Sequence, residues 1–288
     1  MGESVWFETE KDSPGTEQAR SAIDQGCDVV IAVGGDGTVR AVAEGMHGSG
    51  VPLALVPQGT GNLLAHHLAL PIDDLSASVD IALNGQTRSI DIGLADWTRP
   101  DGSKESHAFA VMAGMGLDAQ IMSSTDEGLK KRVGVLAYVK AGAVALLKGR
   151  RMTLQYRIDG GEPKLTKVHT VLVGNVGTIG KNVTLMPDAS IDDGILDVVA
   201  ARPVGPLGWI AVAWRVLVDN GFLRRLKSTR MRERDDNARE LRYLQCTHID
   251  LNLREPEEIE LDGDHFGEIR SASIEVARDA LAVKIKAG

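Results

Sequence analysis

Two short glycine-rich segments near the start of the chain carry residues that could bind phosphate. The first, residues 34–38, reads Gly-Gly-Asp-Gly-Thr, and the second, residues 59–62, reads Gly-Thr-Gly-Asn. Each follows an apolar run and precedes a helical pattern, which predicts a strand–turn–helix unit. Such a turn directs backbone N–H groups and a helix N-terminus at an anion, most simply a phosphate. Asp36 adds a carboxylate for Mg²⁺ or for a hydroxyl proton, so these segments predict phosphoryl transfer.

Two common nucleotide-binding patterns do not fit the first turn. A P-loop would continue into Gly-Lys-Ser/Thr, which does not follow here. The dinucleotide fingerprint would place a third glycine at Arg40, although Gly35 and Gly37 are spaced correctly. The simpler interpretation is a tight strand-to-helix turn in which Asp36 caps a helix. Two such turns in adjacent units, both containing Gly-Thr, favour the functional interpretation.

Alternating strands and helices surround the two turns. We expect strands at residues 5–9, 28–33 and 53–56 and helices at residues 16–25, 39–46, 63–70 and 73–83. The run at residues 28–33 is almost wholly apolar, which is typical of a strand covered on both faces. Short loops between alternating elements predict a parallel sheet covered by helices.

The pattern changes after about residue 93, where strand-like segments lie among Gly, Asp and Pro turns. We expect strands at residues 106–113, 152–158, 168–174, 196–201, 249–253, 273–276 and 280–285. Two long helical patterns, at residues 129–147 and 208–226, interrupt them. This texture predicts a mainly β second domain, and the last strand could belong to either domain.

Composition and charge limit the class of protein. The 288 residues suffice for two domains, and 43% hydrophobic and 25% charged residues are typical of globular proteins. A net charge of −8 disfavours a nucleic-acid partner. Cys27 and Cys246 lie far apart, and the start lacks signal-peptide character, so we expect a reducing cytoplasm. No apolar run reaches the length of a membrane span, so any membrane contact would be peripheral.

Four motifs resemble those of one kinase superfamily, in the same order along the chain. Residues 33–38 resemble the GGDGT signature of diacylglycerol kinases, sphingosine kinases, NAD kinases and distant phosphofructokinases. Residues 57–65 are similar to the P-x-G-T-x-N signature of the lipid-kinase branch, and the Asn-Glu motif of NAD kinases has no match. Residues 192–197 resemble the D-D-G-x-L-D segment of bacterial diacylglycerol kinases, and residues 261–264 resemble their late D-G-E/D motif.

The resemblance implies a fold and a reaction. The fold is an α/β ATP-binding domain of the phosphofructokinase/NAD-kinase type over residues 1–93, to which residues 279–288 could return, and a β-sandwich lipid-substrate domain over residues 94–278. The reaction is that of a diacylglycerol-kinase-like phosphotransferase, which uses ATP and Mg²⁺ to phosphorylate the hydroxyl of diacylglycerol or a related lipid. We expect a cytoplasmic protein, peripheral to the membrane that holds its lipid, with a homodimer as an open option.

The resemblance also implies roles for single residues. The nucleotide contacts that it implies are Thr9, Gly34, Gly35, Asp36, Gly37, Thr38, Val39, Arg40, Ala41, Gly59, Thr60, Gly61 and Asn62. Asp36 would also lie near the metal, and Ser190, Asp193 and Ile195 match a structural Mg²⁺ site in which some ligands are backbone carbonyls. Asp264 matches the acidic residue proposed as proton acceptor, where the family usually has glutamate.

The late acidic segments also have a simpler interpretation. Residues 192–194 and 262–264 both have ordinary β-turn compositions, and each by itself predicts a turn rather than a site. Turns rich in oxygen atoms do suit Mg²⁺, which prefers carboxylate, carbonyl and water oxygens. The resemblance favours the functional interpretation.

A basic segment follows the second long helical pattern. The apolar residues of that pattern and the basic residues between Arg224 and Arg234 could lie on an anionic membrane surface, where each basic residue contributes about 1 kcal/mol. The alternative is a core helix followed by a strand with a solvated basic face, since Thr229, Met231 and Glu233 alternate with arginines. We favour this alternative.

Two other functions remain open. One is a kinase for another hydroxyl, such as a sphingoid base; the second signature makes NAD the less favoured acceptor. The other is a catalytically inactive regulatory protein that binds a nucleotide or a lipid. It is kept because the chain lacks the first strand and the Asn-Pro loop with which family members usually open. A missing central strand predicts an unpaired sheet edge.

Overall fold

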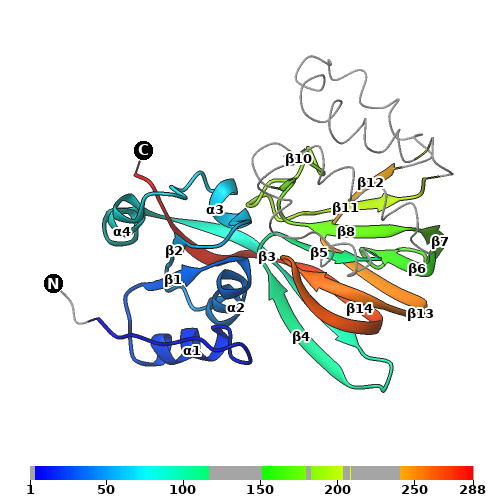
Figure 1. Ribbon diagram of the computed structural model, residues 1–288. Coiled ribbons are helices and arrows are strands. Elements are labelled where there is room, and N and C mark those ends of the chain that lie inside the picture. The colour runs from blue at the N-terminus through cyan, green and yellow to red at the C-terminus, as the bar shows by residue number, and fades with distance from the viewer. Residues whose placement is uncertain (1–3, 117–150, 180–182, 204–207, 209–240, 288) are drawn as a thin grey trace, which may run out of the picture.

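The computed structural model describes residues 4–116, 151–179, 183–203, 208 and 241–287, and these form two parts that lie side by side (Figure 1). The helices of the described residues gather in the first part, and strands build the second. This arrangement confirms the predicted fold class, an α/β domain followed by a β sandwich. Among the helices of the described residues, none has the length and apolar character that crossing a membrane requires.

Strands and helices alternate in the α/β domain. Its elements are α1 (Thr16–Asp24), β1 (Val30–Gly34), α2 (Asp36–Met46), β2 (Leu53–Pro57), α3 (Leu63–His67) and α4 (Leu75–Asn84). β1 and β2 run parallel, with Val30 opposite Leu53 and Gly34 opposite Pro57. Buried residues of α1 and α2 pack with those of both strands in one hydrophobic core. The predicted alternation and parallel pairing are therefore confirmed.

β1 is the outer strand of this sheet, and one of its faces is open to solvent. Within the described residues it pairs with β2 alone. Ile31 and Val33 share a face because side chains alternate along a strand, and Val33 is 52% exposed while Ala32 is buried. The prediction of a strand covered on both faces is therefore wrong for β1. β2, by contrast, is buried along its whole length.

The prediction of a strand at residues 5–9 is also wrong. Residues 4–9 form neither helix nor strand, and Trp6 is largely exposed. No described strand pairs with this segment, and a single bridge between Glu10 and Ser13 follows it. β-Branched and aromatic residues favour a strand only where a neighbouring strand supplies a packing surface, so the composition of this segment was not sufficient.

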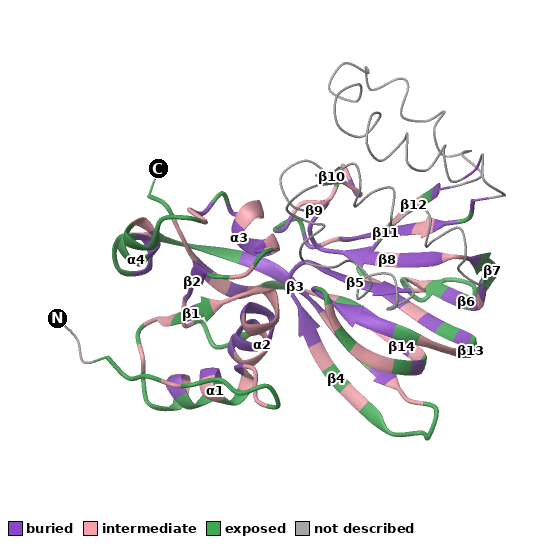
Figure 2. Ribbon diagram, viewed as in Figure 1, coloured by how far each residue is buried: buried purple, intermediate pink, exposed green. Residues whose placement is uncertain are grey.

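The remaining strands build the β sandwich and its junction with the α/β domain. They are β3 (Gln86–Thr98), β4 (Lys104–Phe109), β5 (Met112–Met115), β6 (Met152–Ile158), β7 (Lys164–Val168), β8 (Thr170–Gly174), β9 (Thr178–Ile179), β10 (Val183–Thr184), β11 (Leu196–Ala201), β12 (Leu241–Cys246), β13 (His248–Leu261) and β14 (Asp264–Ile285). β13 pairs with β6 near its start and with β5 near its end, so the sheet divides there into two layers around a second core. Figure 2 shows buried residues concentrated along β8 and β11.

The 22-residue strand β14 joins the two domains. Its first half pairs with β13, and Val283 near its end lies opposite Leu53 of β2. The strand bends at Asp279, where φ is +49°, and its register with β3 shifts between Ala277 and Leu281. The two strands predicted at residues 273–276 and 280–285 are thus one strand with a bulge. β3 runs through residue 93, and the predicted domain boundary there stays a prediction.

Several predicted segments need smaller corrections. β6 and β11 have the predicted bounds, but the strand predicted at residues 106–113 is divided into β4 and β5. The helix predicted at residues 63–70 ends at His67, because Ala69 adopts a left-handed φ of +54°. The long helical patterns at residues 129–147 and 208–226 and the basic segment from Arg224 to Arg234 lie outside the described residues, except for residue 208.

Candidate active site

The first glycine turn connects β1 to α2. Gly35 is the N-cap residue of α2, in an extended conformation with φ −91°, and no described side chain caps this helix. The first turn of the 11-residue helix therefore offers backbone N–H groups and the positive end of the helix dipole. A Cβ on Gly34 would lie 2.8 Å from the hydroxyl oxygen of Thr38, so only glycine lets this side chain lie so close. The turn has the chemistry of a phosphate-binding site.

Asp36 links the two glycine turns. Its Oδ2 accepts a hydrogen bond from the backbone N–H of Asn62 (2.8 Å), and its Oδ1 accepts one from that of Leu63 (2.6 Å). Asp36 is thus the first residue of α2, and its side chain caps the N-terminus of α3. Burial raises the pKa of Asp36, and the charge of Asp264 adds to this rise, while the two N–H groups oppose it.

The second glycine turn is closed by its own asparagine. Asn62 adopts a left-handed conformation with φ +47°. Its Oδ1 accepts a hydrogen bond from the N–H of Gly59 (3.0 Å), and its Nδ2 donates one to the Gly59 carbonyl (2.7 Å). The two turns also touch, because a Cβ on Gly59 would lie 2.6 Å from the Cα of Gly35. The spacing of glycine and asparagine in the second turn is explained by this internal closure.

The hairpin between β13 and β14 brings Asp264 to the first glycine turn. Asp262 and Gly263 make the hairpin turn, with φ values of +50° and +93°. A Cβ on Gly37 would lie 2.8 Å from Oδ1 and 3.0 Å from Oδ2 of Asp264, so this carboxylate lies directly over Gly37. The Asp264 side chain is 39% exposed. An accessible carboxylate of the β sandwich therefore lies beside the open helix end of the α/β domain.

Asp262 fixes the position of this hairpin. Its buried carboxylate accepts hydrogen bonds from the backbone N–H groups of Ala110 (2.8 Å), Val111 (2.9 Å) and Met112 (2.8 Å). Burial raises the pKa of Asp262 to about 6, against the effect of these three bonds. Because the three N–H groups turn toward Asp262, the strand predicted at residues 106–113 breaks between β4 and β5.

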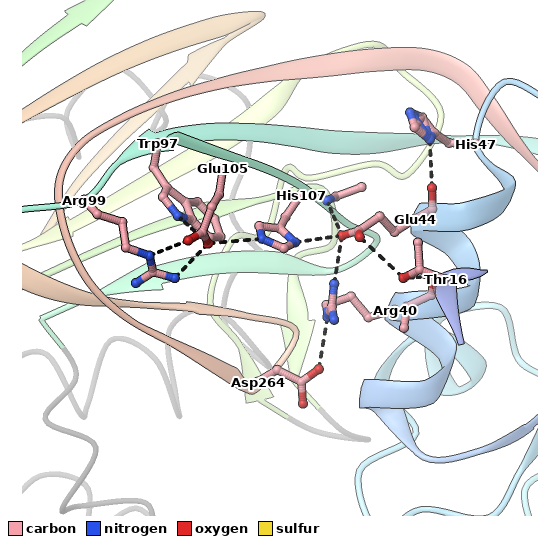
Figure 3. Close-up of polar contacts among 11 residues, drawn as sticks. Thr16, Arg40, Glu44, His47, Trp97, Arg99, Glu105, His107 and Asp264 are labelled. Carbon is pink, nitrogen blue, oxygen red and sulfur yellow. Dashed lines mark hydrogen bonds and ion pairs between the residues drawn. The ribbon is translucent and has the colours of Figure 1, made fainter. Parts of the chain in front are cut away.

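Arg40 holds Asp264 from the side of α2 (Figure 3). Its Nε donates to Asp264 Oδ2 at 3.0 Å, and its Nη1 donates to Glu44 Oε2 at 3.0 Å. The ring of Phe266 covers the guanidinium, whose carbon lies 4.8 Å from the ring centroid. The Arg40 side chain is only 5% exposed. An almost fully buried arginine thus bridges two carboxylates.

Glu44 is itself held by the β sandwich. Besides Arg40, its Oε2 accepts a hydrogen bond from the backbone N–H of Ala108 (3.0 Å) and contacts Nδ1 of His107 (3.2 Å). Burial by itself would raise the pKa of Glu44, but the bonds from His107 and Ala108 and the charge of Arg40 bring it below its ordinary value of 4.5. Glu44 is therefore an ionised anchor for Arg40.

The polar cluster continues along the sandwich from His107 to Arg99 (Figure 3). His107 Nε2 lies 3.5 Å from Glu105 Oε2, and two N–H groups of Arg99 hold Glu105 at 2.6 and 2.7 Å. The Arg99 hydrogen bond lowers the pKa of Glu105 to about 2. The rings of Trp97 and Phe266 pack on His107, with centroids 4.7 and 4.6 Å away. These contacts hold His107 in one place.

Comparison with known proteins identifies the family. A family model described as the diacylglycerol kinase catalytic domain matches residues 3–95, and one described as the YegS C-terminal NAD kinase beta sandwich-like domain matches residues 111–284. The chain belongs to the family of bacterial diacylglycerol kinases and YegS-like lipid kinases. Membership confirms the expected enzyme class, a phosphotransferase with an alcohol acceptor, and the expected two-part fold.

Individual family members are similar over most of the chain. The diacylglycerol kinase of Bacillus subtilis is 28% identical over 258 residues, which cover 88% of this chain and 76% of that protein. A Xanthomonas axonopodis pv. citri protein named "Probable lipid kinase YegS-like" is 32% identical over 89% of this chain and 78% of its own. A crystal structure of a Bacillus anthracis diacylglycerol kinase superimposes with a TM-score of 0.64 over 98% of this chain and 84% of its own, at 17% identity, which shows the shared fold.

In this diacylglycerol kinase family member, the residues predicted to bind Mg²⁺ occupy one turn before β11. Asp193 Oδ1 accepts a hydrogen bond from the N–H of Ile195 (3.0 Å), and Ser190 donates to Asp192 (3.0 Å). Burial raises the pKa of Asp193, and the charges of Asp91 and Asp192 add to the rise. Hydroxyl, carboxylate and carbonyl oxygens suit a hard cation, which would relieve this charge. The types of oxygen suit Mg²⁺, but the described residues contain no group of three or more His, Cys, Asp or Glu arranged to hold a metal ion, so the assignment stays a prediction.

The predicted nucleotide contacts fall into two groups. The glycine turns bring most of them together, whereas the side chains of Val39 and Ala41 are buried in the core and could contribute only through their backbone. Thr60 is exposed at the edge of the second turn. Thr9 lies in the exposed segment before α1, and none of the hydrogen bonds or ion pairs of the described residues links it to either turn. Their roles stay predictions.

Residues missed by the sequence reading surround Asp264. Glu44, His107, Phe266 and Asp262 all bear on its position; Glu44 lies in α2 and His107 in β4, while Asp262 and Phe266 belong to the same hairpin as Asp264. One signal was available, because Glu44 follows Arg40 by four residues on a predicted helix, the spacing at which an ion pair forms. The contacts with the β sandwich had no such local signal.

Proposed function

We propose that this protein is an ATP- and Mg²⁺-dependent lipid kinase that phosphorylates the hydroxyl of diacylglycerol or a related lipid. One observation carries the proposal: the carboxylate of Asp264 lies directly over Gly37, in the first turn of a helix that no described side chain caps. A proton acceptor and an anion-binding helix end are thus adjacent, as phosphoryl transfer to an alcohol requires. The names of family members support a lipid as acceptor.

The chemistry follows from this adjacency. The phosphates of ATP bind at the first glycine turn, where the backbone N–H groups of α2 and the hydroxyl of Thr38 face them. The lipid hydroxyl binds beside Asp264, which accepts its proton as the oxygen attacks the γ-phosphorus. The bond from that phosphorus to the β-phosphate oxygen breaks, and ADP leaves with its electron pair. Fixed N–H dipoles stabilise the charge that builds on the phosphoryl oxygens.

The proposal also includes bound Mg²⁺ and a membrane surface that holds the acceptor lipid. Ser190, Asp193 and Ile195 would hold a structural Mg²⁺; when bound, the ion offsets the negative charge of this turn. A Mg²⁺ ion that accompanies ATP would neutralise phosphate charge, and Asp36 would lie near it while its two oxygens stay hydrogen-bonded to the N–H groups of Asn62 and Leu63. The acceptor lipid lies in a membrane, so the protein works at a membrane surface; we place it on the cytoplasmic side. A homodimer remains an open option.

A direct assay tests the proposal. The purified protein is incubated with γ-labelled ATP, Mg²⁺ and vesicles that contain diacylglycerol, a sphingoid base or neither, and the labelled product is identified. We expect label in phosphatidic acid. Asp264→Asn should reduce the rate by about 10³-fold or more while the protein stays folded, since the proton acceptor is lost. Asp264→Glu, which restores the usual family residue, should keep most of the activity. Equal rates for Asp264→Asn and wild type would refute the role of this residue.

A further inference from the structure

Arg40 directs its Nε and Nη1 donors at protein carboxylates. Its Nε donates to Asp264 and its Nη1 to Glu44, both at 3.0 Å. The Phe266 ring lies over the guanidinium, and the side chain is 5% exposed. A phosphate ligand must reach its anion, and a side chain buried between two carboxylates is poorly placed to do so. The geometry therefore differs from the phosphate contact that the family resemblance implies for Arg40.

Glu44 keeps Arg40 in this orientation. The same Oε2 atom that binds Arg40 also accepts a hydrogen bond from the backbone N–H of Ala108 and contacts the ring of His107. A backbone N–H of the β sandwich cannot swing away as a side chain does. Glu44 is thus fixed to the sandwich although it belongs to α2, and it lies one helical turn from Arg40 on the same face.

The Asp264 side chain, by contrast, is not fixed by its own hairpin. It is the first residue after a tight hairpin turn, and its side chain is 39% exposed. The hydrogen bond to Oδ2 that the structure records comes from Arg40. Catalysis by a proton acceptor depends on its being held within a fraction of an ångström of the reacting oxygen.

We propose that Arg40 is a positioning residue for Asp264 rather than a ligand of the ATP phosphates, and that Glu44 is its anchor. The role rests on the proposed function, because it assumes that Asp264 meets the acceptor hydroxyl. Arg40 fixes Oδ2 of Asp264 through its Nε and leaves Oδ1 for the hydroxyl proton. The planar guanidinium suits this task, since it can donate to two carboxylates in fixed directions.

The first experiment separates binding from turnover. Arg40→Lys keeps the charge, but a single ammonium group cannot bridge Glu44 and Asp264 in the same geometry. We expect kcat to fall by about 10- to 100-fold, since misplacement of a catalytic group by about 1 Å has this effect. The Kd for ATP, measured by calorimetry without lipid, should change by less than about 2-fold, whereas loss of a charged phosphate contact would weaken it by about 10-fold or more. Arg20→Lys, an exposed arginine of α1, is the matched control and should leave both values unchanged.

A double-mutant cycle tests whether Arg40 acts through Asp264. If it does, Arg40→Lys should cause no further loss of turnover in the Asp264→Asn background, where the group to be positioned is already disabled. Glu44→Gln provides a second variant in case Arg40→Lys folds poorly, and it should show the same pattern with a smaller loss. Glu17→Gln, an exposed glutamate of α1, is its control.

The outcomes are distinct. A weaker Kd for ATP in Arg40→Lys, or losses that multiply in the double variant, would overturn the positioning role. Unchanged kcat in both Arg40→Lys and Glu44→Gln would do so as well. If the wild-type protein phosphorylates no lipid, the proposed function fails instead. The calorimetric measurement of ATP binding still decides whether Arg40 contacts ATP, because it is made without an acceptor lipid.

Discussion

The first glycine turn leaves the N-terminus of α2 without a side-chain cap, whereas the second is filled by protein groups. In the second turn, Asn62 pairs with both backbone groups of Gly59, and Asp36 takes the N–H groups that begin α3. The two segments look alike in the sequence, with Gly-Thr in each. Their hydrogen bonds assign them different tasks: the first is available to an anion, and the second supports the first.

This difference also changes the meaning of Asp36. Its position in the first turn indicates a group for metal or substrate, yet both of its oxygens accept hydrogen bonds from the second turn. The carboxylate that meets the first turn from outside is Asp264, which the β sandwich supplies. In the proposed function, structural support and proton acceptance thus fall to two aspartates, Asp36 and Asp264, that lie far apart in the chain.

Among the changes within the two glycine turns, the largest expected effect comes from adding one methyl group to the first turn. In Gly37→Ala the new Cβ would lie 2.8 Å from Asp264 Oδ1, so the carboxylate must move away. We expect lipid phosphorylation to fall by about 100-fold. The free energy of unfolding should stay the same or rise by up to about 1 kcal/mol, because alanine favours a helix over glycine. Kinetics and urea unfolding measure the two effects; a stable and fully active variant would contradict this picture of the first turn.

Asp36→Asn should instead weaken the fold. Asparagine offers one acceptor oxygen in place of two, so one of the N–H groups of Asn62 and Leu63 loses its partner. The expected loss in free energy of unfolding is about 1–3 kcal/mol, the cost of an unsatisfied buried donor. Urea unfolding measures it. Loss of activity with no loss of stability would show that Asp36 acts on the reaction directly.

The pH dependence of the same variant sharpens this assignment. Because burial raises the pKa of Asp36 above 3.8, the folded protein binds the proton more tightly than the unfolded chain does. Its titration therefore contributes stability below this ordinary pKa, and the contribution is lost as the pH rises through the folded-state value. The wild-type free energy of unfolding minus that of Asp36→Asn should thus decrease from about pH 4 upward. Urea unfolding at stepped pH values would contradict this if the difference increased.

Asn62 tests the closure of the second turn. Asn62→Gly keeps the left-handed backbone but removes two hydrogen bonds with Gly59, and it should cost about 1–2 kcal/mol of unfolding free energy. Asn62→Ala should cost about 1 kcal/mol more, because alanine disfavours a φ of +47°. Thermal or urea unfolding of both variants separates the hydrogen bonds from the backbone strain. Equal stability of all three proteins would mean that the asparagine does not close the turn.

The smallest expected effect concerns the exposed edge of the second turn. Thr60 is exposed, and the family resemblance implies that it contacts the nucleotide; the variants test a contact through its hydroxyl. Thr60→Val should weaken ATP binding by about 2- to 5-fold, the value of a single neutral hydrogen bond, and Thr60→Ser should restore it. Calorimetry with ATP provides the measurement. If Thr60→Val weakened ATP binding by more than about 10-fold, the second turn would contribute more to phosphate binding than the first, and the contrast between the two turns would be wrong.

Local patterns were enough for the elements that position the turns. The apolar run before Gly34 and the stripe after Thr38 predict β1 and α2, because periodic burial leaves a signature within ten or so residues. Composition gave wrong predictions where the structure of a segment depends on a neighbouring strand or helix. The segment at residues 5–9 has strand residues without a partner strand, and β1 has an apolar face that the described residues leave open.

Single residues of the candidate site were predictable from the sequence, but the contacts between them were not. Asp264 was found through its motif, and its contacts were not, since Arg40, Glu44 and His107 reach it or support it from α2 and β4. Asp262, two residues earlier in the same motif, is a buried anchor for the chain between β4 and β5. Two acidic residues of one turn therefore differ in role because one points into the core and the other does not.

The sequence by itself determined the strand–turn–helix units, the family and the residues able to bind phosphate or accept a proton, since propensity, periodicity and short motifs are local properties. Only the tertiary structure decided which glycine turn stays open, which aspartate supports it and which carboxylate meets it. Those outcomes depend on contacts between residues far apart in the chain, such as Asp36 with Leu63 and Arg40 with Asp264. A side chain's partners are set by the packing of whole elements, and no segment carries that information alone.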